Sequence, residues 1–181
     1  INAGLVGSEM CIRDSEYTTH FYGLAGHGSQ PDKGVNAVEY ASKFIQKLLE
    51  IREHLKNNPP KNSIFNPPYT TLQIGGISGG IARNVIADKC KVDWELRPVV
   101  KKDGEFVNSE IDKFINEKLL PEMKKTYPGS KIEKEIIGEI VGFDREEKSD
   151  ACELVSSITG DNSRNVVSFG TEAGLFQEIG I

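Results

Sequence analysis

In the stretch CKVDWELR, residues 90–97, apolar and charged side chains alternate without a break, and this is the clearest structural signal in the chain. The apolar set is Cys90, Val92, Trp94 and Leu96, and the charged set that alternates with it is Lys91, Asp93, Glu95 and Arg97. Successive side chains of a β-strand point to opposite faces of a sheet, so this period of two predicts a strand. One face of that strand packs against a core and the other faces water.

Outward from this strand, the sequence predicts an alternation of strands and helices. The predicted strands cover residues 17–24, 69–75, 84–97 and 131–141, and the predicted helices cover residues 36–57 and 105–127. Asn36 can cap the first helix, with Glu39 three residues later as in a capping box. The residues expected to face inward are Val38, Ala41, Ile45, Leu48, Leu49 and Leu55 in the first helix and Ile111, Phe114, Ile115, Leu119 and Met123 in the second. Pro121 should kink the second helix, and a glycine-bearing turn is predicted at residues 76–80.

The order strand, helix, strand, strand, helix, strand resembles the ferredoxin-like βαββαβ plan, which predicts an α+β domain over residues 16–141. Residues 1–15 show no helical or strand period, and their text resembles junction sequence from assembled environmental reads. We expect them to form a tail that is foreign to the gene. Residues 142–181 predict a helix over 150–159 and a short strand over 165–169, too little to close a core. We interpret them as the truncated part of a second domain.

Composition and charge exclude several classes of function. The chain of 181 residues carries 22 Lys and Arg against 27 Asp and Glu, a formal net charge of −5. A mildly acidic chain without a basic run repels a phosphate backbone, so nucleic acid and anionic membranes are not expected partners. The three cysteines, Cys11, Cys90 and Cys152, form no C-x-x-C pair that could hold a structural zinc. With no signal peptide visible, we expect the protein to be cytoplasmic.

A histidine among small residues is the first candidate for chemistry. It is His27, in the stretch GHGSQPDKGVNA at residues 26–37. A histidine at a strand-to-helix turn, surrounded by residues too small to bury it, is free to donate a hydrogen bond to a ligand. The plainer interpretation is that His27 caps the turn.

Two further pairs of polar residues are candidates for substrate binding. Asn84 and Arg97 are an amide and a guanidinium that one strand is expected to bring near each other, a combination suited to gripping a carboxylate. Thr171 and Glu172, in FGTEA, are a hydroxyl and a carboxylate at a strand-to-turn segment. The plainer interpretations are a solvated strand face for the first pair and an ordinary helix start for the second.

Together these motifs resemble the acetylornithine deacetylase-like family of zinc-dependent metallopeptidases and aminoacylases. The resemblance is carried by GVNAVEYASKFIQKLLEIREHL, YTTLQIGGISGGIARNVIADKCKVDWELRPV and FGTEAGLFQ. It implies that residues 16–141 are the family's lid, or dimerisation, domain, and that residues 142–181 belong to an α/β catalytic domain with a two-zinc site. It also implies a homodimer that removes the acyl group from an N-acylated amino acid, N-acetylornithine in arginine synthesis.

The resemblance assigns roles to the candidate residues. His27 is expected to reach into the partner subunit's active site and polarise the scissile carbonyl. Asn84 and Arg97 are expected to hold the substrate's carboxylate. Thr171 and Glu172 match a substrate-contacting loop of the catalytic domain.

The metal ligands of the family have no counterpart in this sequence. Its three histidines are His20, His27 and His54, whereas a two-zinc site needs several histidine and carboxylate ligands. We therefore assign no metal residue and expect the zinc ions in the full-length enzyme. The chain alone is expected neither to hold zinc nor to hydrolyse N-acetylornithine.

Alternatives of two classes stay open. Succinyl-diaminopimelate desuccinylase and dipeptidases share the lid pattern, although the GTEA segment favours the deacetylase. A stand-alone ferredoxin-like module for dimerisation or ligand sensing would need no metal, but it would have no need of residues 142–181. An RNA-binding sheet of this topology should show paired exposed aromatics and a basic face, which a net charge of −5 disfavours.

Overall fold

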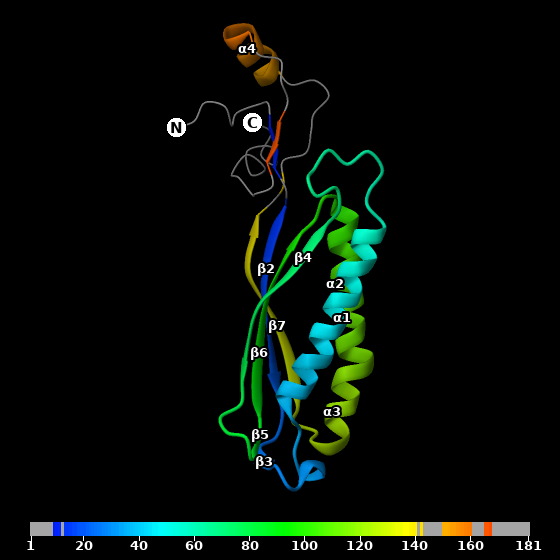
Figure 1. The fold of residues 1–181 in the computed structure, drawn as a ribbon, viewed down its shortest axis with the longest axis vertical. Helices are drawn as coiled ribbons and strands as arrows, with labels where there is room; N and C mark the ends of the chain where they lie inside the picture. Colours follow the sequence, from blue (N-terminus) through cyan, green and yellow to red (C-terminus); the bar gives the residue numbers. More distant parts are fainter. Residues whose placement is uncertain (1–8, 12, 141, 143–149, 161–164, 168–181) are drawn as a thin grey trace.

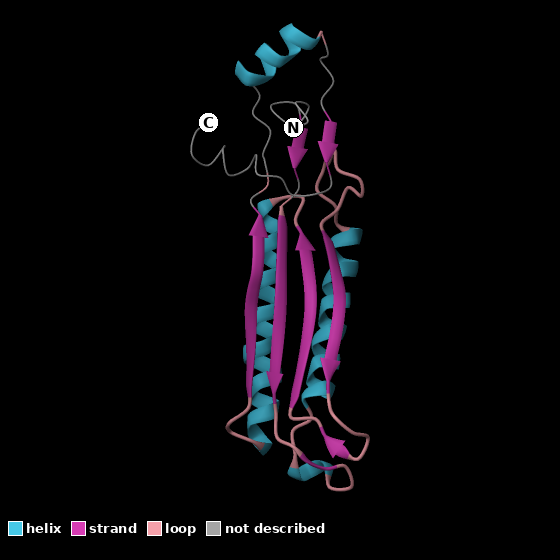
Figure 2. Ribbon diagram, turned by 90° about the vertical axis from the view of Figure 1, so that its left-hand side faces the viewer, coloured by secondary structure: helices cyan, strands magenta, loops and turns pink. Residues whose placement is uncertain are grey.

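The computed structural model describes residues 9–11, 13–140, 142, 150–160 and 165–167. Its main part is a four-stranded antiparallel sheet with the strand order β4-β6-β2-β7. The strands are β2 (Asp14–Tyr22), β4 (Thr71–Gly79), β6 (Lys89–Arg97) and β7 (Lys131–Ile140). The helical segments are α1 (Ala37–Asn57), α2 (Lys101–Phe114), the π-helical turn η3 (Ile115–Leu119) and α3 (Leu120–Thr126). All of them cover one face of the sheet (Figures 1 and 2), which confirms the ferredoxin-like α+β prediction.

The core lies between the sheet and the helices, and β6 supplies its centre. Cys90, Val92, Trp94 and Leu96 are all buried, as their alternation predicts. The Trp94 ring stacks on Tyr17 at a centroid distance of 4.3 Å, and its indole N–H donates a 3.0 Å hydrogen bond to Oγ1 of Thr19. The one polar atom of this large side chain is thereby satisfied inside the core.

Helix α1 begins as predicted, and the predicted inward positions Ala41, Leu48 and Leu55 are buried, which confirms them. The Asn36 side chain accepts a hydrogen bond from the backbone N–H of Val38 and donates one to Glu39, which confirms the cap. The buried residues are Ala37, Ala41, Phe44, Leu48, Ile51 and Leu55. These positions recur at alternating steps of four and three, so they form one straight stripe. The predicted inward positions Val38, Ile45 and Leu49 lie beside that stripe and are only half-buried.

The second helical segment is interrupted where a kink was predicted. The π-helical turn η3 directly precedes α3, whose first two residues are Leu120 and Pro121. Proline lacks the N–H that would continue the α-helical hydrogen bonding, so the chain widens by one residue before it. The buried residues are Val107, Ile111, Ile115, Leu119 and Met123. Phe114, also predicted to face inward, is half-buried.

Two predictions about the strands are wrong. Residues 76–79, predicted as a turn, continue β4, which bulges between Ile74 and Gly76 instead of ending there. A bulge lets an edge strand pass through glycines without losing its partner. The predicted strand over 84–97 is divided into β5 (Val85–Ile86) and β6, because β5 leaves the main sheet to pair elsewhere.

The ends of the chain also differ from the prediction in part. Residues 9–11 form β1 (Glu9–Cys11), which pairs in parallel with β8 (Asn165–Val167), and β2 starts at Asp14. The expectation of a tail without regular structure is therefore wrong for these residues, because strand pairing across the chain gives them partners that no local pattern shows. The predicted helix over 150–159 is confirmed as α4 (Asp150–Thr159). None of the described helices combines the length and apolarity needed to cross a bilayer.

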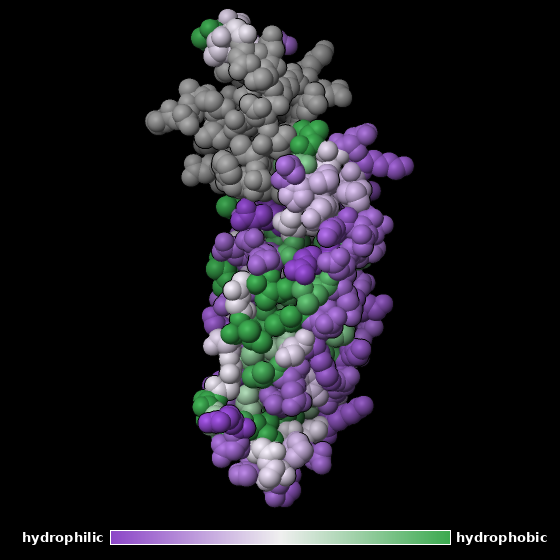
Figure 3. Space-filling model, viewed as in Figure 1, coloured by the Kyte–Doolittle hydropathy of each residue, from purple (hydrophilic) through white to green (hydrophobic). Residues whose placement is uncertain are grey.

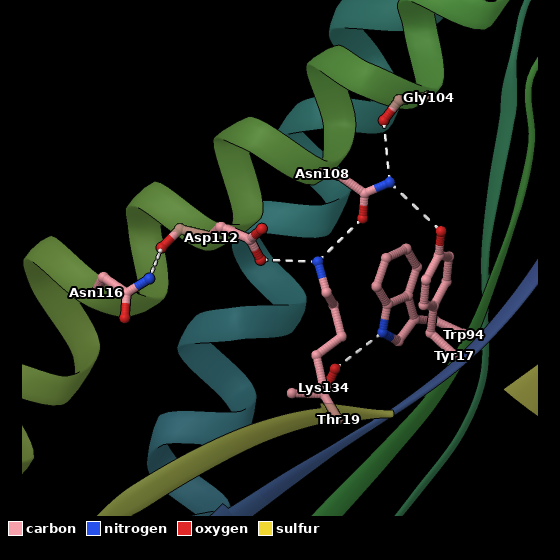
Figure 4. Close-up of polar contacts among 8 residues, drawn as sticks. All are labelled: Tyr17, Thr19, Trp94, Gly104, Asn108, Asp112, Asn116 and Lys134. Carbon is pink, nitrogen blue, oxygen red and sulfur yellow. Dashed lines mark hydrogen bonds and ion pairs between the residues drawn. The ribbon is translucent and has the colours of Figure 1, made fainter. Parts of the chain in front are cut away.

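A network of hydrogen bonds and an ion pair connects the edge strand β7 to α2 (Figure 4). The Lys134 ammonium group donates to Oδ1 of Asn108 at 3.0 Å and to Oδ1 of Asp112 at 2.7 Å, and it lies over the Tyr17 ring. The Asn108 amide in turn donates to the carbonyl of Gly104 and to the Tyr17 hydroxyl. Because the Lys134 side chain is only 18% exposed, these contacts are needed to satisfy its charge.

Candidate functional site

Two loops meet at one end of the sheet and form what we call the tip, residues 23–36 and 80–88. The tip lies at the bottom of Figure 1. Its loops are joined by β3 (Gly26–His27), which pairs with β5 so that His27 lies opposite Val85. The next backbone N–H, of Gly28, donates a 2.8 Å hydrogen bond to the carbonyl of Asn84. The structure therefore brings His27 and Asn84 together, both with exposed side chains.

The first loop of the tip can fold back on itself only because residue 23 is a glycine. Leu24 and Val35 exchange two backbone hydrogen bonds, of 3.0 and 2.9 Å. A Cβ at Gly23 would collide with the carbonyl oxygen of Val35, a backbone atom that cannot move aside. The close approach fixes the path of the chain into β3, and with it the position of His27.

One edge of the His27 ring is already engaged within the loop. Its Nδ1 lies 2.7 Å from Oγ of Ser29 and 3.3 Å from the backbone nitrogen of Ser29. The other ring nitrogen, Nε2, is on the far side of the imidazole. An exposed imidazole held by one nitrogen can present the other to a ligand, as the sequence predicts for His27.

Arg97 lies at the opposite end of the sheet from the tip. Its Nη2 is 3.2 Å from Oε2 of Glu95 and 3.3 Å from Oδ2 of Asp14, and its side chain is 29% exposed. Burial raises the pKa of the Asp14 carboxyl, and the charge of Arg97 opposes that rise. The guanidinium is thus held in a carboxylate-lined position close to Thr71, its neighbour on β4.

The expected proximity of Asn84 and Arg97 is wrong for a single chain. β6 lies between them, and an extended strand rises about 3.3 Å per residue, so its nine residues span roughly 26 Å. Asn84 precedes the Lys89 end of this strand, whereas Arg97 ends it. The two side chains cannot grip one carboxylate in the same subunit. That each of them binds substrate stays a prediction.

The remaining sequence candidates are not brought into this site. Thr171 and Glu172 lie outside the described residues. His20 is at the middle of the sheet, with Nε2 3.2 Å from Oε2 of Glu135, and His54 is exposed on α1 beside the ring of Phe106. Among the residues that the structure describes, no three His, Cys, Asp or Glu side chains gather in a group that could hold a metal ion.

The helix-free face of the sheet carries linked charges. Thr18 donates a 2.8 Å hydrogen bond to Asp93, and Lys91 donates one of 3.0 Å to the same carboxylate. These two contacts hold the pKa of Asp93 below its ordinary value. The charged side chain of Asp93 on β6 thus has partners on its own strand and on the neighbouring strand, as expected for a solvated sheet face.

Ser29 is the residue at the tip whose contact the sequence did not predict. It stands in the quoted stretch of residues 26–37, but nothing in the pattern assigns it to the histidine ring. The available signal is its spacing: a serine two residues after a residue in a turn can bond back to that residue.

Comparison with protein families gives a match over most of the domain described above. The family described as the peptidase dimerisation domain matches residues 15–123. Acetylornithine deacetylase from Photorhabdus laumondii subsp. laumondii is 31% identical over 157 residues, which are 87% of this chain and 39% of that protein. The chain therefore spans less than half the length of that relative.

Solved structures share the fold. Aminopeptidase PepT from Bacillus cereus matches with a TM-score of 0.67 and 19% identity, over 97% of this chain and 44% of that one. An aminobenzoyl-glutamate utilization protein from Klebsiella pneumoniae matches with a TM-score of 0.64 and 16% identity, over 98% of this chain and 44% of that one. At sequence identities this low, the similarity to these two structures shows a shared fold alone.

Proposed function

Because the chain belongs to the peptidase dimerisation domain family, we propose that it is the dimerisation lid of a metal-dependent amidohydrolase. In the most specific form of this proposal, the enzyme is an acetylornithine deacetylase, which splits N-acetylornithine and water into ornithine and acetate. The identity of 31% to such an enzyme supports this substrate. Succinyl-diaminopimelate and dipeptides are the competing substrates, and the assay below includes them.

The described residues cannot supply the zinc site of the proposed enzyme, because no group of His, Cys, Asp or Glu side chains among them could hold a metal ion. We propose that other segments of a longer protein hold them. The contribution of the lid is then to position the substrate and to stabilise charge, and this depends on His27, Asn84 and Arg97.

The observation that carries the proposal is the difference between the two edges of the sheet. The edge strand β7 carries five charged residues among ten, whereas the other edge strand, β4, carries none in TLQIGGISG. Charged side chains protect an edge strand from pairing with another chain, so β4 is the edge left open for a partner. Figure 3, drawn in the same view as Figure 1, shows apolar side chains gathered over β4 and the adjoining side of α1.

Individual residues account for this apolar surface. Ile77 on β4 is 50% exposed, and Ile74 on β4 is half-buried. Val38 and Ile45, on the neighbouring helix α1, are half-buried as well. A second copy of the lid that pairs along β4 would cover all four, and the two sheets would become one continuous sheet.

A two-fold pair formed through β4 also explains why the candidate residues lie at opposite ends of the lid. β4 runs from Thr71, beside Arg97, toward the tip. Two such strands related by a two-fold axis are antiparallel, so each tip comes to the Arg97 end of the other lid. His27 and Asn84 of one subunit would then approach the partner subunit's Arg97, and each active site would contain residues of both chains.

In this arrangement His27 and Arg97 have different tasks. A ring N–H of His27 is aimed at the oxygen of the scissile carbonyl, where negative charge develops in the transition state. The Arg97 fork binds the substrate's carboxylate, whose charge is the same before and during the reaction. Asn84, beside His27 at the tip, adds an amide donor to the same ligand.

The test uses the complete protein encoded by the gene and a panel of N-acetylornithine, N-succinyl-diaminopimelate and a dipeptide. Turnover should be highest with N-acetylornithine. His27→Ala should lower kcat by roughly 10²–10³-fold with little change in KM, whereas Arg97→Ala should chiefly raise KM. His54→Ala, a matched change of an exposed histidine on α1, should alter neither. Absence of activity on all three substrates, or equal effects of the two histidine variants, would overturn the proposal.

A further inference from the structure

The contact between His27 and Ser29 bears on which nitrogen of the His27 ring carries the proton. A neutral imidazole has one nitrogen that carries a proton and one that accepts hydrogen bonds. A histidine that stabilises negative charge must present its protonated nitrogen to the ligand. The side of the ring held inside the loop therefore decides whether His27 can do so.

A backbone N–H can only donate. The N–H of Ser29 points to Nδ1 of His27 at 3.3 Å, so Nδ1 is the accepting nitrogen in this contact. The Ser29 hydroxyl lies 2.7 Å from the same atom and can donate to it as well. With Nδ1 occupied as an acceptor, the ring proton of the neutral form is on Nε2, the nitrogen turned away from Ser29.

We propose that Ser29 is a positioning residue: it holds His27 by Nδ1 in the tautomer that presents Nε2–H outward from the tip. This inference rests on the proposed function of His27 as a donor to the substrate's carbonyl oxygen. The pairing of His27 with Val85 and the hydrogen bond from Gly28 to Asn84 fix the backbone on both sides of the ring. Ser29 then fixes the ring itself.

The arrangement has a consequence for the reaction. If Nδ1 carried the proton, it would donate to Ser29 Oγ, and Nε2 would present a lone pair that repels the negative carbonyl oxygen. Ser29 therefore selects the useful one of two neutral forms that differ only in the place of one proton.

The direct test is nuclear magnetic resonance of the 181-residue chain with ¹⁵N-labelled histidine, at about pH 8.5, where histidine rings are neutral. Long-range ¹H–¹⁵N spectra distinguish protonated from accepting ring nitrogens. His27 should show a protonated Nε2 and a hydrogen-bonded Nδ1. In Ser29→Ala the Nδ1 resonance should move downfield toward that of an unbonded acceptor, and Ser29→Thr should restore it.

Matched controls are present in the same chain. Ser42→Ala makes the same chemical change on α1, where the Ser42 hydroxyl bonds to its own helix, and it should leave the His27 resonances in place. The His54 ring is an internal reference that none of the serine variants should affect. A proton on Nδ1 of His27, or identical His27 spectra in the wild type and Ser29→Ala, would refute the positioning role.

A kinetic measurement separates this inference from the proposed function. In the complete enzyme, Ser29→Ala should lower kcat by roughly five- to tenfold, the usual effect of one neutral hydrogen bond, and leave KM unchanged. Ser29→Thr should recover most of that loss. If His27→Ala lowers kcat strongly while Ser29→Ala has no effect, His27 keeps its role and only the inference about Ser29 fails. If His27→Ala has no effect, the proposed function fails first.

Discussion

Replacing Ile77 by lysine tests whether β4 is the edge through which two lids join. Ile77 lies opposite Val92, on the side of the sheet that the helices cover, and is 50% exposed. In a two-fold pair its exposed half is covered in both protomers, because each contributes the same surface. A lysine there must bring an ammonium group into an apolar interface or keep the strands apart.

The size of the effect follows from the exposed fraction. Burial of a whole isoleucine side chain contributes about 1.5–3 kcal/mol. Half of Ile77 is already covered within one chain, so about 0.8–1.5 kcal/mol per protomer, or about 1.5–3 kcal/mol per dimer, is left for association. Since 1.4 kcal/mol corresponds to a factor of ten, Ile77→Lys should weaken the dimer by roughly 10- to 100-fold.

Ile136→Lys is the matched control. Ile136 also lies on an edge strand, β7, opposite Tyr17 on the helix-covered side, and is 58% exposed. Sedimentation equilibrium at micromolar concentrations gives the dissociation constant of each variant, and circular dichroism checks that each is folded. Ile77→Lys should weaken the dimer and Ile136→Lys should leave it unchanged. A wild-type chain that stays monomeric, or a stronger effect at Ile136, would refute the assignment of the interface to β4.

Three further predictions concern the stability and chemistry of the lid. Phe44→Ala removes a fully buried aromatic ring and should lower the free energy of unfolding by about 3–5 kcal/mol in urea denaturation; a loss below about 1 kcal/mol would contradict the packing. The pKa of Asp93 is lowered by Thr18 and Lys91, so its contribution to stability is present above the unfolded value of 3.8 and is lost as the pH falls through the lower folded value. Asp93→Asn should therefore reduce the fall of Tm on acidification below about pH 5, and an unchanged fall would refute that reasoning. Burial raises the pKa of the Cys90 thiol, so at about pH 8 iodoacetamide should modify Cys90 more slowly in the folded chain than in urea, by peptide mass spectrometry; equal rates would contradict its burial.

The sequence predicted the main elements of the fold because most of them have a strong local period. The alternation along KCKVDWELR is a property of neighbouring residues, and β6 follows it throughout. Elements whose limits depend on distant partners were predicted less well. The glycines of β4 indicate a turn by composition, yet pairing with β6 keeps the strand going to Gly79. The short β5 leaves the sheet because β3, almost sixty residues earlier in the chain, pairs with it.

The candidate site shows the same division. The exposure of His27 follows from the small residues around it, which are local. The separation of Asn84 from Arg97 depends on the length of β6 and on the change of pairing partner at β5. The two residues therefore lie in one sequence motif but far apart in the folded chain. The contact of Ser29 with the His27 ring depends on rotamers that no sequence pattern specifies.

A complementation assay in the complete enzyme, in which His27→Ala and Arg97→Ala subunits are mixed, shows whether each active site contains residues of both chains. If the tip acts on the partner subunit's site and Arg97 on its own, a mixed dimer has one site with both residues intact. After full subunit exchange half of the dimers are mixed and each has one working site, so we expect about a quarter of the wild-type kcat/KM, well above either parent. Activity that stays at the mean of the two parents, with exchange demonstrated by differently tagged subunits, would contradict an active site built from both chains.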